Sequence, residues 1–128
     1  MLKQLKDAGY ILGVATSKYE GHAIETLQYH GILGFFDYVT GANIDETISK
    51  KNEVIEESLK RFNAQSNKSN VLMIGDMKYD VIGAQTVGID SLGVYTGTAK
   101  ENELETAGAT YIAYSFNELH EFLLNKLV

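Results

Sequence analysis

The chain has 128 residues, 45% of them hydrophobic, and a net charge of −6 from 17 Asp and Glu against 11 Lys and Arg. A chain of this length and composition can bury the core of one globular domain, and an acidic chain without a basic stripe is not expected to bind nucleic acid. No apolar run approaches the length of a membrane span, and the absence of cysteine excludes disulfides and thiolate metal sites and fits a cytoplasmic protein.

The first half of the chain alternates short apolar runs with amphipathic stretches. Met1–Ala8 is expected to be helical and to end at Gly9, because glycine readily adopts the left-handed conformation of a helix cap. The elements expected next are a strand, a helix, a strand and a helix, at Tyr10–Ala15, Tyr19–His30, Phe35–Gly41 and Asn52–Phe62.

The second half continues the same alternation. Its expected strands are Val71–Ile74, Ser91–Thr96 and Thr110–Ala113. Its expected helices are Val81–Val87, Glu101–Ala107 and a last one that ends at Leu127. Ser115 and Glu118 have the spacing of a capping box, which favours a helix start at this point.

Strands that alternate with helices predict an α/β fold, with a parallel sheet covered by helices on both faces. We therefore expect residues 1–128 to form a single domain with a Rossmann-like, three-layer architecture. Ligands of such sheets bind beyond the carboxyl ends of the strands. The residues that follow the predicted strands are therefore the candidates for a functional site.

Polar residues gather at these strand ends. Thr16 and Ser17 follow the first strand, Asp76 and Asp80 follow "VLMI", and Lys50 and Lys51 open a helix that can face the same edge. Gly97 and Thr98 follow the "SLGVYT" strand. Taken singly, such residues are often only helix caps or solvated charges. Together, a hydroxyl, a lysine and two carboxylates make a site for a phosphate and a divalent cation.

Three segments resemble the motifs of the haloacid dehalogenase superfamily, and within it the phosphoglycolate phosphatase-like hydrolases. "GVATSK" is similar to the second motif, "SKKNEVIEESL" to the third and "MIGDMKYDVIGAQTVGI" to the fourth. The resemblance implies that Thr16, Lys51, Asp76 and Asp80 are catalytic-site residues. It assigns phosphate binding to Thr16, Ser17 and Lys51, with Lys51 favoured over Lys50, and Mg²⁺ binding to Asp76 and Asp80.

The first motif of the family, an Asp-x-Asp that supplies the nucleophile, occurs nowhere in the 128 residues. The resemblance therefore implies a Mg²⁺-dependent phosphoric monoester hydrolase with an incomplete core, inactive as this chain alone. The implied substrate is a small phosphorylated metabolite, with phosphoglycolate the nearest guess. The nucleophile strand would lie between the strands that end at Ala15 and Ile74, so a homodimer or an N-terminal fragment is expected to complete the sheet.

Two other classes of protein compete with this interpretation. A response-regulator receiver domain uses similar residues around Mg²⁺, but its acids precede its hydroxyl and lysine, whereas here Thr16 and Lys51 precede Asp76. A non-catalytic anion-binding or interaction module remains open because the nucleophile motif is absent. An Asp-x-Asp upstream in the reading frame would indicate a truncated enzyme, and its absence there a pseudoenzyme.

Overall fold

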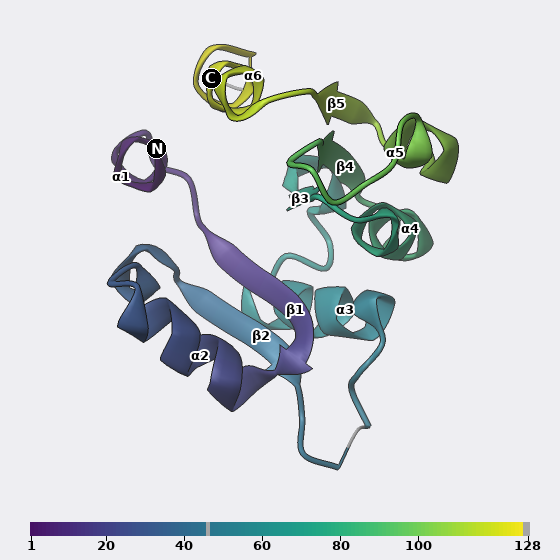
Figure 1. Ribbon diagram of the computed structural model, residues 1–128. Coiled ribbons are helices and arrows are strands. Elements are labelled where there is room, and N and C mark those ends of the chain that lie inside the picture. The colour runs from purple at the N-terminus through teal and green to yellow at the C-terminus, as the bar shows by residue number, and fades with distance from the viewer. Residues whose placement is uncertain (46, 127–128) are drawn as a thin grey trace. The chain divides into compact units, whose positions relative to one another are not determined.

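The computed structural model describes residues 1–45 and 47–126, and the chain divides into two compact units, Met1–Ser66 (unit 1) and Asn67–Val128 (unit 2). Each unit is built around its own parallel sheet, β1-β2 in unit 1 and β3-β4-β5 in unit 2 (Figure 1). Every strand pairing is parallel, as the alternation of strands and helices predicts. No helix among the described residues is both long and apolar enough to span a membrane.

Unit 1 packs its helices around a two-stranded sheet. Both α2 and α3 contact both strands, and Val54, Ile55 and Leu59 of α3 are buried. The elements in chain order are α1 Leu2–Asp7, β1 Gly13–Tyr19, α2 Glu20–Tyr29, the 3₁₀ turn Leu33–Phe35, β2 Tyr38–Ala42 and α3 Lys51–Arg61.

Unit 2 packs α4 and α5 on one face of its sheet and α6 on the other (Figure 1). Strand β4 is central, and its Leu92 is completely buried, whereas Ile74 of the edge strand β3 is 40% exposed. The elements are the 3₁₀ turn Lys68–Asn70, β3 Leu72–Gly75, α4 Lys78–Val87, β4 Asp90–Val94, α5 Glu103–Ala107, β5 Tyr111–Ala113 and α6 Phe116–Glu121, which continues as a π-helix over Phe122–Lys126.

The elements follow the predicted order, and the largest differences lie in β1 and β2. The first strand was expected at Tyr10–Ala15 but runs from Gly13 to Tyr19. Tyr10 is not part of it because its N–H donates to Leu5 O at the end of α1. Strand β2 begins at Tyr38 rather than Phe35, since residues 33–35 form a 3₁₀ turn.

Helix ends agree more closely with the sequence patterns. The left-handed Gly9 (φ 94°) follows α1, and Ser115 Oγ accepts the Glu118 N–H at 3.1 Å, as expected of a helix N-cap. Glu118 accepts the N–H of Tyr114 rather than that of Ser115, so the capping box is shifted by one residue. The predicted end of this last helix, Leu127, lies outside the described residues.

Candidate functional site

Thr16 and Ser17 lie in an irregular stretch of β1. The regular pairing runs to Ala15↔Thr40 and resumes only at Tyr19↔Ala42, so residues 16–18 of β1 lie opposite Gly41 alone. This bulge turns the chain away from the regular ladder. Thr16 Oγ1 accepts the Lys18 N–H at 3.2 Å, which closes a local turn. The strand was expected to end at Ala15, and the structure shows instead that it continues through a bulge.

Gly41 provides the space for this bulge. A Cβ at Gly41 would lie 2.6 Å from Lys18 O and 2.7 Å from the Cα of Glu20. Such contacts are far inside van der Waals distance, so only glycine allows β2 to approach the bulge this closely. Gly41 was expected only as the last residue of a strand, although a glycine in a strand often marks a bulge.

Lys51 and Lys50 occupy different environments at the start of α3. Lys51 is half-buried, and its Nζ donates to Ala15 O at 2.7 Å, at the residue that precedes Thr16. Lys50 is exposed, and its backbone N–H donates to Glu53 Oε1 at 2.9 Å. The Lys51 ammonium therefore lies beside the last residue of β1 that pairs regularly with β2, just before the bulge. We call Thr16, Ser17 and Lys51 the unit 1 cluster.

Asp76 follows β3 directly and contacts the loop after β4. Its Oδ2 accepts hydrogen bonds from Thr96 Oγ1 at 3.2 Å and from Thr98 Oγ1 at 3.4 Å. Thr98 was expected at this edge, whereas Thr96 was expected inside the strand. Strand β4 ends at Val94, which leaves Thr96 in the loop.

Asp80 belongs to the first turn of α4, which begins at Lys78 rather than at the predicted Val81. Its Oδ2 accepts the Met77 N–H at 3.2 Å, so the carboxylate caps the helix as well as standing beside the strand end. A negative charge in this first turn also complements the helix dipole. We call Asp76, Asp80, Thr96 and Thr98 the unit 2 cluster.

The unit 2 cluster has the donor chemistry of a Mg²⁺ site. Carboxylate and hydroxyl oxygens are hard ligands, and Mg²⁺ commonly binds through one or two carboxylates and retains several waters. The Asp80 carboxylate lies against Gly75, where any other residue would place its Cβ. Among the described residues there is no group of three or more His, Cys, Asp or Glu side chains able to hold a metal. The two carboxylates, Asp76 and Asp80, have the ligand chemistry that Mg²⁺ prefers.

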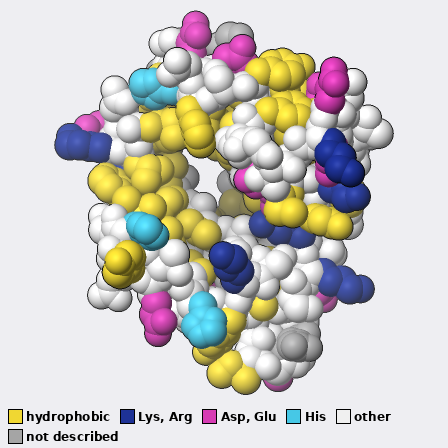
Figure 2. Space-filling view, in the orientation of Figure 1, with side chains coloured by type: hydrophobic (Ala, Val, Ile, Leu, Met, Phe, Trp, Pro, Cys, Tyr) yellow, Lys and Arg dark blue, Asp and Glu magenta, His cyan; other side chains and the backbone are white. Residues whose placement is uncertain are grey.

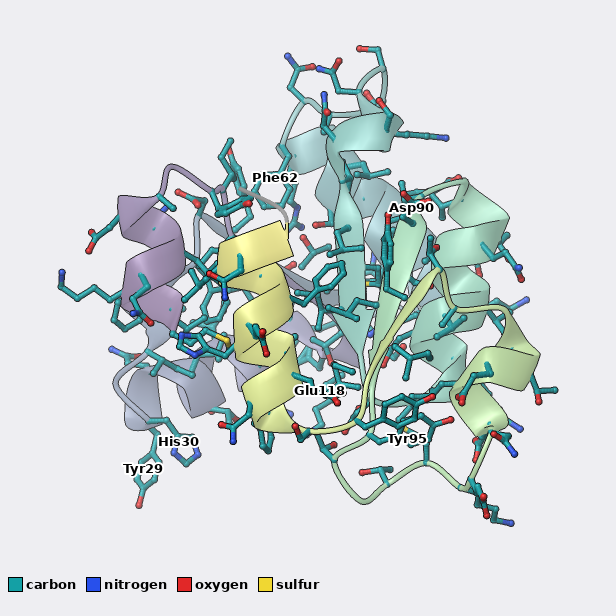
Figure 3. The ribbon with its side chains drawn as sticks, turned by 90° about the horizontal axis from the view of Figure 1, so that it is seen from above. Tyr29, His30, Phe62, Asp90, Tyr95 and Glu118 are labelled. Atoms are coloured by element: carbon teal, nitrogen blue, oxygen red, sulfur yellow. The ribbon has the colours of Figure 1, made fainter. Side chains whose placement is uncertain are left out.

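A tyrosine–carboxylate group, which the sequence patterns did not predict, lies at the same end of the unit 2 sheet. Tyr95 and Tyr114 stack with centroids 5.5 Å apart, and both hydroxyls donate to Glu105. Partial burial and the bond to Glu105 raise the pKa of Tyr95, and the Tyr95 hydroxyl in turn lowers the pKa of Glu105. This group ties the ends of β4 and β5 to α5. Figure 3 shows Tyr95 and Asp90 at opposite ends of β4.

The structure therefore brings the predicted residues together in two groups. Thr16, Ser17 and Lys51 gather within unit 1, and Asp76 and Asp80 gather within unit 2. The unit 1 group lies where the regular pairing of β1 ends, at the bulge, and the unit 2 group lies at the carboxyl end of β3, as expected for an α/β fold. That all of them form one catalytic site, and the individual role of each, stay predictions.

Comparison with known proteins identifies the family. Residues 1–94 match the family model described as haloacid dehalogenase-like hydrolase. The tyrosine-protein kinase PtkA of Mycobacterium tuberculosis is 31% identical over 96% of this chain and 42% of its own length. A phosphoglycolate phosphatase of Vibrio parahaemolyticus is 29% identical over 94% of this chain and 52% of its own length.

The solved structures agree with this result. The crystal structure of a predicted phosphatase from Clostridium acetobutylicum is 39% identical, with a TM-score of 0.89, and the match covers 96% of this chain and 56% of that one. The Rossmann-like α/β fold class and the resemblance to phosphoglycolate phosphatase-like hydrolases are thereby confirmed. The chain spans about half the length of the curated relatives it matches. It belongs to the haloacid dehalogenase-like hydrolase family.

Proposed function

We propose that this chain supplies the phosphate-binding and Mg²⁺-binding part of a phosphatase that acts on a small phosphate monoester, such as phosphoglycolate. The observation that carries the proposal is common to both units. In each, residues of a family motif gather where a regular parallel pairing ends, with Lys51 at the last regularly paired residue of β1 before its bulge and Asp76 and Asp80 after β3. The relatives named phosphoglycolate phosphatase support the choice of substrate class.

The unit 1 cluster would bind the phosphate group. The Lys51 ammonium already lies 2.7 Å from Ala15 O, so a modest movement of its flexible side chain brings its charge to an anion beside Thr16. The hydroxyls of Thr16 and Ser17 can donate to phosphate oxygens. A lysine and hydroxyl donors around a phosphate stabilise the negative charge that a transferring phosphoryl group carries.

The unit 2 cluster would hold the metal. Asp76 and Asp80 would be its protein ligands, and bound Mg²⁺ would neutralise charge on the phosphoryl group. Because no Asp-x-Asp occurs in the 128 residues, the proposal assigns binding rather than nucleophilic attack to this chain. We therefore expect little or no turnover of phosphoglycolate by the chain alone.

The two neighbouring lysines provide a matched test of phosphate binding. Inorganic phosphate should be titrated, with Mg²⁺ present, into the wild type, Lys51→Ala and Lys50→Ala, and binding followed by calorimetry or backbone amide shifts. Loss of a charge-assisted contact should weaken binding by about tenfold or more in Lys51→Ala. Lys50→Ala should bind like the wild type, because Lys50 is exposed. Equal effects of the two substitutions, or a larger effect in Lys50→Ala, would remove Lys51 from the site.

We further propose that a second chain, either a separate N-terminal piece or a symmetric partner, adds a strand to these sheets. Among the described strands, β1 pairs only with β2, and β3 pairs only with β4. The 40% exposure of Ile74 is unusual in a parallel sheet, which is normally covered on both faces. Unpaired strand edges of this kind recruit other strands. Light scattering should show association, and a well-folded monomer with β1 paired directly to β3 would refute it.

The small size of the proposed substrate agrees with the charge distribution. Figure 2 shows acidic and basic side chains interspersed on the displayed face, which does not favour a long polyanion such as nucleic acid. The similarity to PtkA makes transfer of a phosphoryl group to a protein tyrosine a second candidate. A non-catalytic anion-binding module is a third candidate function. It would bind phosphate but show no turnover, even after the missing nucleophile strand is supplied.

A further inference from the structure

The loop after β4 provides two hydroxyl groups to a single carboxylate oxygen. Thr96 Oγ1 and Thr98 Oγ1 lie 3.2 Å and 3.4 Å from Asp76 Oδ2. Both threonines are exposed, so neither is needed to fill the core. Gly97 stands between them in the left-handed conformation (φ 99°), which turns the chain and lets both hydroxyls reach the same atom. Packing alone does not account for this arrangement.

We propose that Thr96 and Thr98 are positioning residues that orient the Asp76 carboxylate for a divalent cation. This inference rests on the proposed function, which makes Asp76 a metal ligand. A hydroxyl has one proton to donate, so the two threonines together supply Oδ2 with two hydrogen bonds. Their bonds leave Oδ1 of the same carboxylate for the cation. Asp76 then enters the site in one orientation rather than as a freely rotating group.

Orientation matters here because the site has few carboxylates. Mg²⁺ requires nearly ideal octahedral geometry, and the terminal torsion of an aspartate is intrinsically broad. Asp80 is already oriented by the Met77 N–H and by its place against Gly75. For Asp76, the hydrogen bonds from the two threonine hydroxyls fill that role. Groups that hydrogen-bond to metal ligands typically change metal affinity by 10- to 100-fold when they are removed.

Each hydroxyl contact is at the long end of the hydrogen-bonding range, which makes each one weak by itself. We therefore expect a few-fold loss of Mg²⁺ affinity in Thr96→Val or Thr98→Val, and about a 10- to 100-fold loss in the double variant. Valine keeps the shape of threonine and removes only the hydroxyl. Thr96→Ser and Thr98→Ser retain the hydroxyl and should restore most of the affinity.

The test is a titration of the full chain with Mg²⁺, or with Mn²⁺ as a spectroscopic probe, and it requires no turnover. Thr106→Val, on the exposed surface of α5, is the matched control and should bind like the wild type. The unfolding midpoints of all variants, measured without metal, should stay close to one another. If the threonines had a purely structural role, their substitution would change the unfolding midpoints and leave the Mg²⁺ affinity unchanged.

Two failures are distinguishable. If the wild type binds no cation, or binds one equally well in Asp76→Asn, the metal site of the proposed function is wrong and the inference fails with it. If the wild type binds in an Asp76-dependent manner but the double valine variant binds as tightly, the metal site stands and the role of Thr96 and Thr98 is refuted. A loss that the serine variants do not restore also refutes it, since the hydroxyl would not then be the active group.

Discussion

The carboxylate of Asp80 occupies the space over Gly75 in which every other residue would carry its Cβ. The end of β3 and the first turn of α4 can therefore pack this closely only because residue 75 is glycine. The same Asp80 oxygen accepts the Met77 N–H, so the carboxylate is held from two sides. A glycine also allows a close approach in unit 1, where the backbone of Lys18 and Glu20 lies against Gly41 at the bulge of β1. Glycines thus determine where polar groups can stand at these strand ends.

Substitution of Gly75 by alanine should displace the Asp80 carboxylate. The new methyl group overlaps it, so we expect a loss of about 1–3 kcal/mol in the free energy of unfolding and weaker binding of Mg²⁺. Gly34→Ala is the control, because nothing lies within 4 Å of its Cβ position. Urea unfolding and a cation titration on both variants measure the two effects. Wild-type cation affinity in Gly75→Ala would show that the position of Asp80 is not required.

The order of elements and the end of β3 were predictable because apolar runs and glycines mark them clearly, as in "VLMIGD". The bulge after Ala15 was not, since a two-residue slip in pairing depends on the neighbouring strand and leaves no mark in the alternation of β1 itself. The start of α4 was also missed. Its N-cap, Met77, is not a capping residue type, and the cap is formed by the side chain of Asp80 one turn later.

Thr40 carries a buried hydroxyl that makes no hydrogen bond within the described part of the chain. Its side chain is completely buried in β2, beside Ala15. Thr40→Val removes the unsatisfied group without changing its shape, so the free energy of unfolding should rise by about 1 kcal/mol or more. Thr40→Ser keeps the hydroxyl and loses a methyl group, which should lower it by about 1 kcal/mol. Destabilisation by valine in urea unfolding would mean that the hydroxyl has a partner.

Asp37 links α1 to the start of the unit 1 sheet. Its Oδ2 accepts Lys6 Nζ at 2.7 Å and the Leu12 N–H at 2.9 Å, and these bonds lower the pKa of Asp37 below its ordinary value of 3.8. A lowered pKa in the folded chain means that the carboxylate stabilises the fold above its ordinary pKa, and that this stabilisation is lost as the pH falls through the folded value.

Asp37→Asn should therefore be less stable than the wild type near neutral pH, and the two should converge in strong acid. The measurement is urea unfolding of both proteins across the acidic range. Added salt should reduce the part of the difference that comes from Lys6, because the pair is partly exposed. A stability difference that does not change with pH would contradict the assigned cause.

We propose that this chain binds a phosphate through the unit 1 cluster and Mg²⁺ through the unit 2 cluster. A Mg²⁺-dependent phosphatase needs both ligands at once, so each ligand should affect the binding of the other, and this coupling must be reciprocal. Independent sites would show no such coupling. The claim can therefore be tested in the chain alone, without any turnover.

The decisive measurement is the affinity of the chain for inorganic phosphate with and without Mg²⁺. We predict that Mg²⁺ tightens phosphate binding by about 5- to 150-fold, the usual range of coupling between sites. The effect should disappear in Asp76→Asn and persist in Asp90→Asn, which changes an exposed acid at the amino end of β4 (Figure 3). Phosphate binding that is equally tight with and without Mg²⁺ in the wild type would contradict the account.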